Sequence, residues 1–218
     1  MTMTPTFKHT IRRTVAAALL AAAGGLAHAD ATDDFFTAVK RDNGGGITEL
    51  VRRGVDPNVR DAKGQTALVT AMREDSLKVA EALLASPGID VDAANAVGET
   101  PLMLAAIKGR LDWCRRLLDR GARVERPGWT PLHYAASGPE AKVVALLLDR
   151  GANVEAESPN RSTPLMMAAR YGTEDSVKVL LDRGADVARR NELGLSAADF
   201  ARDAGRESLS RRLAAPAR

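Results

Sequence analysis

The fold of this chain is decided by the stretch Thr130-Pro131-Leu132-His133-Tyr134-Ala135-Ala136. Threonine is a good N-cap, because its hydroxyl accepts a hydrogen bond from a free backbone N–H at the start of a helix. Proline fits the first helical position, where its missing N–H would have no partner anyway. We therefore expect a short helix that begins at Thr130-Pro131, and the double alanine that follows lets a neighbouring helix approach closely.

The same signal recurs along the chain at a nearly constant spacing. Thr-Pro-Leu occurs three times, a weaker Thr-Ala-Leu at 66–68 precedes it, and Ser-Ala-Ala at 196–198 follows it, at intervals of 34, 30, 33 and 33 residues. The helix-starting pairs are Thr100-Pro101, Thr130-Pro131 and Thr163-Pro164. A second landmark keeps the same register, a series of glycines at Gly54, Gly88, Gly121, Gly151 and Gly184. An internal repeat of about 33 residues therefore organises the chain.

Each repeat is expected to be a pair of helices. The second helix, such as 143–148, has Val and Leu at helical spacing and ends in a glycine, which readily takes the left-handed conformation at a helix C-terminus. Stretches rich in Asp, Asn, Gly and Pro, such as 90–98 and 186–194, separate the pairs and are typical of turns. Because no pair could bury its apolar face alone, the pairs must stack, and the sequence predicts an all-α solenoid.

The repeats resemble the ankyrin repeat, whose pattern of about 33 residues carries Thr-Pro-Leu-His-x-Ala. Residues 130–135 match that pattern fully, and the resemblance covers everything from Asp33 onward. It implies one elongated domain at 30–218 with four repeats between two caps. The predicted units are an N-terminal cap at 30–63, repeats at 64–97, 98–127, 128–160 and 161–193, and a C-terminal cap at 194–218.

The first 29 residues have the pattern of an export signal. Lys8, Arg12 and Arg13 form a charged region, 15–23 is an apolar run of nine residues, and 27–29 reads Ala-His-Ala, which fits a small-x-small cleavage rule. We expect cleavage between Ala29 and Asp30 and a periplasmic location. Arg12-Arg13 leaves the twin-arginine route open beside the general secretory route. With this signal the chain resembles the exported ankyrin repeat proteins of Gram-negative bacteria.

Composition excludes several classes of function. The net charge of +3 comes from the three cations of the signal, since the remainder carries 28 basic and 28 acidic residues. Such a balanced chain has no general field that would attract nucleic acid. A single cysteine rules out an intrachain disulfide. After cleavage one histidine and one cysteine remain, so the sequence predicts no metal site, no catalytic residues and no cofactor.

Both of those reactive side chains have structural explanations. Cys114 stands where the sibling repeats have Ala or Val, so we expect it to be buried. The resemblance implies that His133 hydrogen-bonds the backbone of neighbouring turns. The same register predicts core positions for Trp113, Met103 and the pair Met166-Met167. Arg116 stands where its siblings are apolar and is expected to loosen local packing.

Three departures from the repeat pattern predict local differences. The connection from Gly121 to Thr130 is three residues shorter than its siblings, so the third turn should be clipped. Gly44-Gly45-Gly46 replaces the start of a second helix and suggests a looser N-terminal cap. The C-terminal cap is expected to expose a charged outer face made by Arg202, Arg206, Arg211 and Arg212.

Positions that do not pack between repeats are the candidates for partner binding. The resemblance places them before the helix-starting threonine and after the double alanine, at Gln65, Arg73, Glu74, Glu99, Ile107, Lys108, Trp129, Ser137, Gly138, Ser162, Arg170 and Tyr171. Tyr, Trp and Arg dominate binding hot spots. The predicted contact patch is therefore Trp129, Arg170 and Tyr171 flanked by Ile107, with Lys108, Arg73 and Glu74 as further partner-binding candidates. Trp129 has an alternative role, packing across the clipped turn, and Tyr134 is expected to be structural.

The function expected on this basis is non-enzymatic binding of one folded protein by a monomer in the periplasm. The resemblance to exported ankyrin proteins implies an accessory role to a periplasmic enzyme in oxidative-stress defence. An alternative is an immunity protein that neutralises a toxin acting in the periplasm. A third reading is a small-molecule binder or an enzyme that uses the clipped turn at 127–129.

Overall fold

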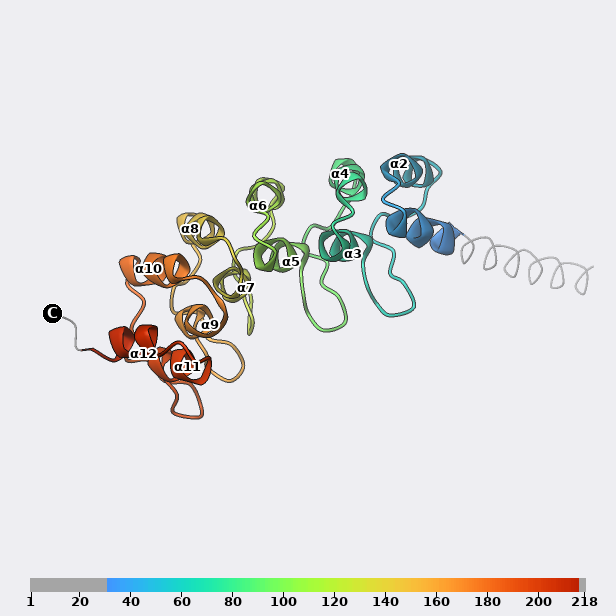
Figure 1. Cartoon of the computed structure of the whole chain (residues 1–218). Coiled ribbons are helices and arrows are strands. Elements are labelled where there is room, and N and C mark those ends of the chain that lie inside the picture. The colour runs from blue at the N-terminus through green and yellow to red at the C-terminus, as the bar shows by residue number, and fades with distance from the viewer. Residues whose placement is uncertain (1–30, 216–218) are drawn as a thin grey trace, which may run out of the picture.

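A computed structural model describes residues 31–215 of the 218 (Figure 1). The predicted export signal at 1–29 and its cleavage point after Ala29 lie outside the described residues. Helical residues 31–40 come first. The helices that follow are α2 (Gly44–Arg52), α3 (Ala67–Glu74), α4 (Leu77–Ala85), α5 (Pro101–Ile107), α6 (Leu111–Asp119), α7 (Pro131–Ser137), α8 (Ala141–Asp149), α9 (Pro164–Tyr171), α10 (Glu174–Asp182), α11 (Ala197–Asp203) and α12 (Glu207–Ala214).

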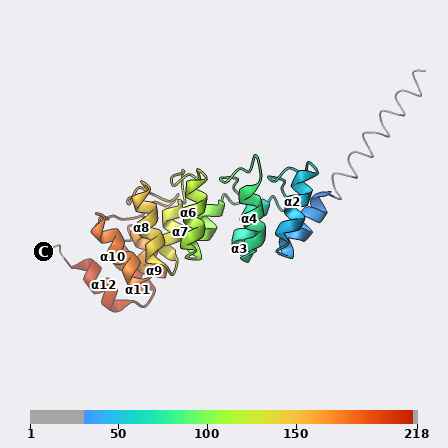
Figure 2. The ribbon, with the colours of Figure 1, turned by 90° about the horizontal axis from the view of Figure 1, so that it is seen from above.

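The helices stack in two layers, as the sequence predicted for an all-α solenoid. An inner layer contains α3, α5, α7, α9 and α11, and an outer layer contains α2, α4, α6, α8 and α10 (Figure 1). Figure 2 shows the outer helices side by side along the stack. Outer helices are spread more widely than inner ones, so the inner layer lies on the concave side (Figure 1). Within residues 31–215 strand pairing amounts to one isolated bridge, between Arg60 and Thr66.

Each inner helix starts at a hydroxyl residue, and in α3, α5, α9 and α11 the hydroxyl caps the helix, whereas in α7 the Thr130 hydroxyl contacts His133 Nδ1 instead. The Thr100 Oγ1 accepts from the backbone N–H of Met103 at 3.3 Å, and Thr163 does the same for Met166 at 3.4 Å. Proline follows each of these threonines at the first helical position. The caps satisfy backbone donors that would otherwise lack partners inside the stack, which fixes where each inner helix begins.

The outer helices α2, α6, α8 and α10 end at glycines with left-handed backbone, whereas Ser86 and Pro87 follow α4. Gly151 has φ +91°, and the N–H of the next residue, Ala152, reaches back to the carbonyl oxygen of Leu147 at 3.0 Å. This bond satisfies a carbonyl in the last turn of α8, and a side chain with a Cβ would be strained at such a φ. The repeat therefore needs a glycine here.

The core runs continuously between the layers. Leucines at the second helical position of the inner helices, Leu102, Leu132 and Leu165, are buried, and so are the double alanines. Cys114 is fully buried on α6, and burial raises the pKa of its thiol to about 12. The thiol therefore stays protonated and packs as a small apolar side chain.

The N-terminal cap corrects one expectation. The glycines do not replace the start of a helix, because α2 begins at Gly44. Asn43 caps it, since its Oδ1 accepts from the N–H of Gly46 at 3.0 Å. A Cβ at Gly44 would overlap the carbonyl of Lys78 on α4. The glycine thus allows α2 to lie against α4, and the expectation of a missing helical start was wrong.

The C-terminal cap corrects a second expectation. Arg206 is half-buried rather than on the outer face, and its Nη1 donates to the carbonyl oxygens of Ala168, Ala169 and Gly172, each within 3.0 Å. These carbonyls belong to the last turn of α9 and to the residue that follows it, where they have few helical partners. Arg206 therefore fastens the C-terminal cap to the preceding repeat, while Arg211 is exposed.

Arg116 also differs from the expectation that it loosens packing. Its guanidinium lies 4.3 Å from the ring centroid of Trp113 and pairs with Glu81 on α4 at 2.6 Å. The position is half-buried in every repeat, so a long side chain with a charged end fits there. The substitution adds a contact between two repeats instead of removing one.

The third turn is short, as its sequence spacing requires. Eleven residues, 120–130, connect α6 to α7, whereas fourteen, 150–163, connect α8 to α9. Arg126 in the short turn donates to the carbonyl oxygen of Gly98 in the preceding turn. Trp129 is the last residue of this turn before Thr130, the N-cap of α7, and it remains partly exposed.

Candidate functional site

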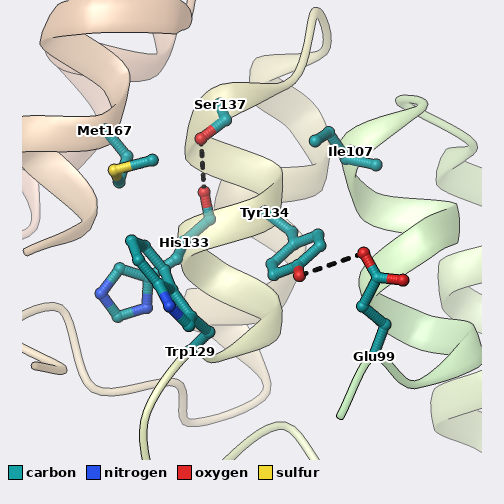
Figure 3. A pocket seen from close by; sticks show the side chains of 7 residues that line it. All are labelled: Glu99, Ile107, Trp129, His133, Tyr134, Ser137 and Met167. Atoms are coloured by element: carbon teal, nitrogen blue, oxygen red, sulfur yellow. Dashed lines mark hydrogen bonds between the residues drawn. The ribbon is translucent and has the colours of Figure 1, made fainter. Parts of the chain in front are cut away.

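A groove of about 320 Å³ opens on the concave side between α5, α7 and α9. The side chains that line it are Glu99, Ile107, Trp129, His133, Tyr134, Ser137 and Met167 (Figure 3). Most of this lining is apolar or aromatic. Five of the lining residues lie on helices that the stack holds in place, and Glu99 and Trp129 lie just before the caps of α5 and α7, so the groove is a formed feature of the fold.

Trp129 forms one wall of the groove and also packs. Its ring meets the ring of His133 edge to face, with 5.3 Å between centroids, and 37% of the residue remains exposed. Trp129 therefore both packs against a neighbouring side chain and keeps part of its surface exposed. Its place in a partner contact stays a prediction.

His133, which packs against the Trp129 ring, is buried, and both of its ring nitrogens form hydrogen bonds. Its Nδ1 accepts from the backbone N–H of Thr130 at 3.2 Å, so its Nε2 carries the proton and donates to the carbonyl oxygen of Ser162 at 3.0 Å. Burial lowers the pKa of the imidazole below its ordinary 6.5. A neutral ring with both nitrogens engaged cannot serve as a base for a bound substrate. Within residues 31–215 there is no group of three or more His, Cys, Asp or Glu side chains that could hold a metal ion.

A polar network closes one end of the groove. The Tyr134 hydroxyl donates to Glu99 Oε1 at 3.3 Å (Figure 3). Glu99 Oε2 accepts from Arg73 Nη2 at 2.9 Å and from Asn95 Nδ2 at 2.8 Å. Burial, aided by the nearby carboxylate of Glu99, raises the pKa of Tyr134 to about 12. The carboxylate is thus neutralised by Arg73 within the protein.

The other end of the groove is apolar and open. Ile107 on α5 is 39% exposed, Met167 on α9 is half-buried, and Ser137 between them has a small side chain whose Oγ donates to the His133 carbonyl at 2.9 Å. The matching positions of the two neighbouring repeats carry the larger side chains of Ile107 and Arg170. The smaller serine leaves open space in the groove at this position. Met167 packs against the core, as expected, but it is only half-buried and its remaining surface lines the groove.

The remaining members of the predicted patch flank the groove. Arg170 lies one helical turn beyond Met167 on α9, and its guanidinium stacks 5.4 Å from the Tyr171 ring and 5.9 Å from the Phe200 ring. Tyr171 is 60% exposed. The structure thus places Ile107 and Trp129 in the groove and Arg170 and Tyr171 beside it.

Other predicted positions are engaged elsewhere or buried. Lys108 pairs with Asp75 at 2.8 Å, and Glu74 is exposed at the end of α3, two repeats from Trp129. Ser162 and Gly138 are buried, and a Cβ at Gly138 would collide with the Ile107 carbonyl. The prediction that these two positions are free surface is wrong, because the repeat uses them for close backbone contact.

The sequence did not predict Tyr134 and Met167 as lining residues, and it predicted Glu99 as a free position but not as part of the contact patch. Tyr134 and Met167 are each the fourth residue after a helix-starting threonine, and this register faces the concave side. That shared offset was the available signal. Glu99 is the residue before the threonine, a position that the repeat pattern had marked as free.

The fold and the groove together define a solenoid of stacked helix pairs that presents its inner layer as a surface. A model of the family described as "Ankyrin repeats (3 copies)" matches residues 35–127 and 123–191. These matches cover more than half of the chain, and the chain belongs to the ankyrin repeat family. Ankyrin repeats generally mediate protein–protein interaction, and the family is typically a non-enzymatic interaction module.

Curated relatives match this chain through the same repeats. Neurogenic locus notch homolog protein 4 of Homo sapiens is 43% identical over 82 residues, which is 36% of this chain and 4% of that protein. The poly [ADP-ribose] polymerase tankyrase of Caenorhabditis elegans is 42% identical over 71 residues, 31% of this chain and 3% of that protein. A transient receptor potential cation channel subfamily A member 1 homolog of Caenorhabditis elegans is 28% identical over 184 residues, 82% of this chain and 13% of that protein.

The chain therefore spans only a small part of these relatives. Their whole-protein activities belong to much longer chains, and the shared part is the repeat array. Across residues 31–215 no helix has the length and apolar character needed to cross a bilayer.

Proposed function

We propose that this protein is a non-enzymatic binding module that holds a protein partner in the groove between α5, α7 and α9. The observation that carries the proposal is the exposed apolar lining of a groove whose walls are fixed by the stack. Ile107, Trp129 and Tyr171 are all more than a third exposed on this one side. Such side chains bury much area for little lost rotamer entropy when a partner covers them.

The chemistry of the lining supports binding rather than catalysis. His133 is neutral and has both ring nitrogens engaged, and the Cys114 thiol is buried outside the groove with its pKa raised to about 12. Glu99 forms an ion pair with Arg73. No lining residue is both free and poised to move a proton, so shape and apolar contact remain as the means of recognition.

The proposed place of action is the periplasm, reached through the export pattern of the first 29 residues. There a monomer would act as an accessory to a periplasmic enzyme, with oxidative-stress defence as the process. Neutralising a toxin that acts in the periplasm is the alternative at the same surface. Both roles use the groove, so the identity of the partner decides between them.

A photo-crosslinking amino acid tests the surface in the producing cell. It replaces Tyr171, beside the groove, and in a matched control it replaces Lys178, exposed on the outer helix α10. The proposal predicts a protein adduct from position 171 and none from position 178. Adding Trp129→Ala to the chain with the crosslinker at position 171 should abolish the adduct. A circular dichroism melt should show that this variant is still folded. The same adduct from both positions would contradict the proposed site.

N-terminal sequencing of the exported protein tests the location. The expected first residue is Asp30, found in the periplasmic fraction. Material that retains Met1 in that fraction would refute cleavage, and its absence from the fraction would refute export.

A further inference from the structure

We propose that the partner presents a carboxylate to Arg170 next to an apolar side chain that fills the groove. This inference rests on the proposed function and adds the chemistry of the partner. It starts from the one cation on the inner helices α3, α5, α7, α9 and α11 that has no acceptor within the described residues 31–215.

The other cationic side chains of the inner layer have acceptors within the protein. Each forms an ion pair with an acidic side chain of the same or an adjacent repeat. The pairs are Arg73 with Glu99, Lys108 with Asp75, and Arg202 with Asp199. The stack therefore neutralises its inner-layer cations as a rule, and Arg170 is the exception.

Arg170 is held in place without being neutralised. Its guanidinium lies over the rings of Tyr171 and Phe200, at 5.4 and 5.9 Å from their centroids, and the residue is half-buried. Within the described residues the guanidinium has neither a hydrogen bond nor an ion pair, and Asp203, which occupies the matching position on α11, does not pair with it. The ring contacts use no N–H hydrogen bond, so the N–H groups of the guanidinium remain available for a carboxylate.

A partner that covers the groove also removes water from Arg170. Desolvating a charge is unfavourable unless the partner supplies an opposite charge, so an acidic group is the complementary one. The acidic end of the groove does not compete for this role, because Glu99 already accepts from Arg73, Asn95 and Tyr134. The uncompensated charge beside the groove is positive.

The geometry also sets the spacing in the partner. Met167 lines the groove, and Arg170 follows three residues later on the same face of α9. Three residues rise about 5 Å along a helix, and an extended chain advances about 3.3 Å per residue. An extended partner segment would therefore carry its acidic residue about one to two positions from the apolar residue.

A displayed library of random peptides tests the inference on the intact protein from Asp30 onward. The peptides selected on the wild type are compared with those selected on Trp129→Ala. Peptides that bind in the groove are those that the wild type selects and Trp129→Ala does not. The expected winners carry an aliphatic or aromatic residue and an Asp or Glu at the stated spacing. A synthetic winner should lose affinity by about tenfold or more when its acid becomes the amide, or when Arg170→Gln is introduced.

Matched variants separate charge from general damage. Arg115→Gln removes an exposed arginine of α6 and should leave the affinity unchanged. Arg170→Glu should reverse the preference, so that the same peptide with Lys in place of its acid binds better than the original. This reversal is not expected from a purely structural role of Arg170.

The outcomes distinguish this inference from the proposed function. Peptides that depend on Trp129 but show no acidic preference, or that bind Arg170→Gln as tightly as wild type, overturn the inference and leave the groove as a binding site. A selection with no peptide that depends on Trp129 overturns both.

Discussion

His133 ties two repeats together, since its Nε2 donates to the carbonyl oxygen of Ser162 in the next repeat at 3.0 Å. The other ring nitrogen accepts from the N–H of Thr130 at the start of its own helix. If Nδ1 were protonated, its N–H would point at the N–H of Thr130, and the hydrogen bond between Thr130 and His133 would be lost. The bridge between repeats therefore requires a neutral ring.

This bridge predicts that acid destabilises the protein. The pKa of His133 is lowered from 6.5 by burial, so below pH 6.5 the unfolded chain binds a proton that the folded chain does not. The free energy of unfolding should fall as the pH drops below 6.5, by up to about 1.4 kcal/mol per pH unit until the folded pKa is passed. Urea melts of the chain from Asp30 onward, whose sole histidine is His133, measure this. The variant His133→Gln should show a flatter profile over the same range, and an equally steep one would exclude His133 as the cause.

Trp129→Ala should separate the two roles of that side chain. Loss of the edge-to-face contact with His133 is expected to lower the free energy of unfolding by about 1 kcal/mol. Affinity for a groove partner should fall by about 2 kcal/mol or more. Trp129→Phe, which keeps an aromatic ring, should recover most of the stability. Unchanged partner affinity in Trp129→Ala would remove this residue from the site.

Arg206→Ala should destabilise the C-terminal cap by about 2 kcal/mol, because three carbonyl oxygens lose a charged donor. Denaturant melts measure the loss, and hydrogen exchange should show it concentrated in α11 and α12. Arg211→Ala is the matched control, since Arg211 is exposed on α12. Equal stability of the two variants would show that Arg206 does not fasten the cap.

Cys114 should be unreactive in the folded protein. A buried thiol with a pKa of about 12 has almost no thiolate at pH 8, so an alkylating reagent should modify it only after denaturant is added. Mass spectrometry with and without urea measures the difference. Cys114→Ser should be less stable than Cys114→Ala, because serine would bury a hydroxyl at an apolar position. Rapid alkylation without urea would contradict the burial.

The repeat pattern predicted the solenoid because each landmark has a local physical cause. Thr100 and Thr163 cap helices and Gly151 ends one, and these roles depend only on neighbouring residues. The clipped third turn followed from counting residues. None of these features needs knowledge of distant contacts.

The errors arose where a distant contact decides the outcome. Arg206 looked like a surface charge until α9 supplied its acceptors, and Gly44 looked like a helix breaker until α4 required its missing side chain. The repeat pattern predicts a free position at Ser162, but His133 of the preceding repeat binds its carbonyl oxygen. The groove itself arises from three helices in adjacent repeats, so spacing alone identified only part of its lining.

The central claim is that the groove and its flank bind a protein partner. The most direct test is the Kd of the partner identified by the crosslink from position 171, measured for the wild type and for a variant with Trp129, Arg170 and Tyr171 all changed to alanine. The account predicts a loss of at least about thirtyfold in a variant that still melts cooperatively, in keeping with hot-spot energies of about 2 kcal/mol. An unchanged Kd in the folded variant would contradict it.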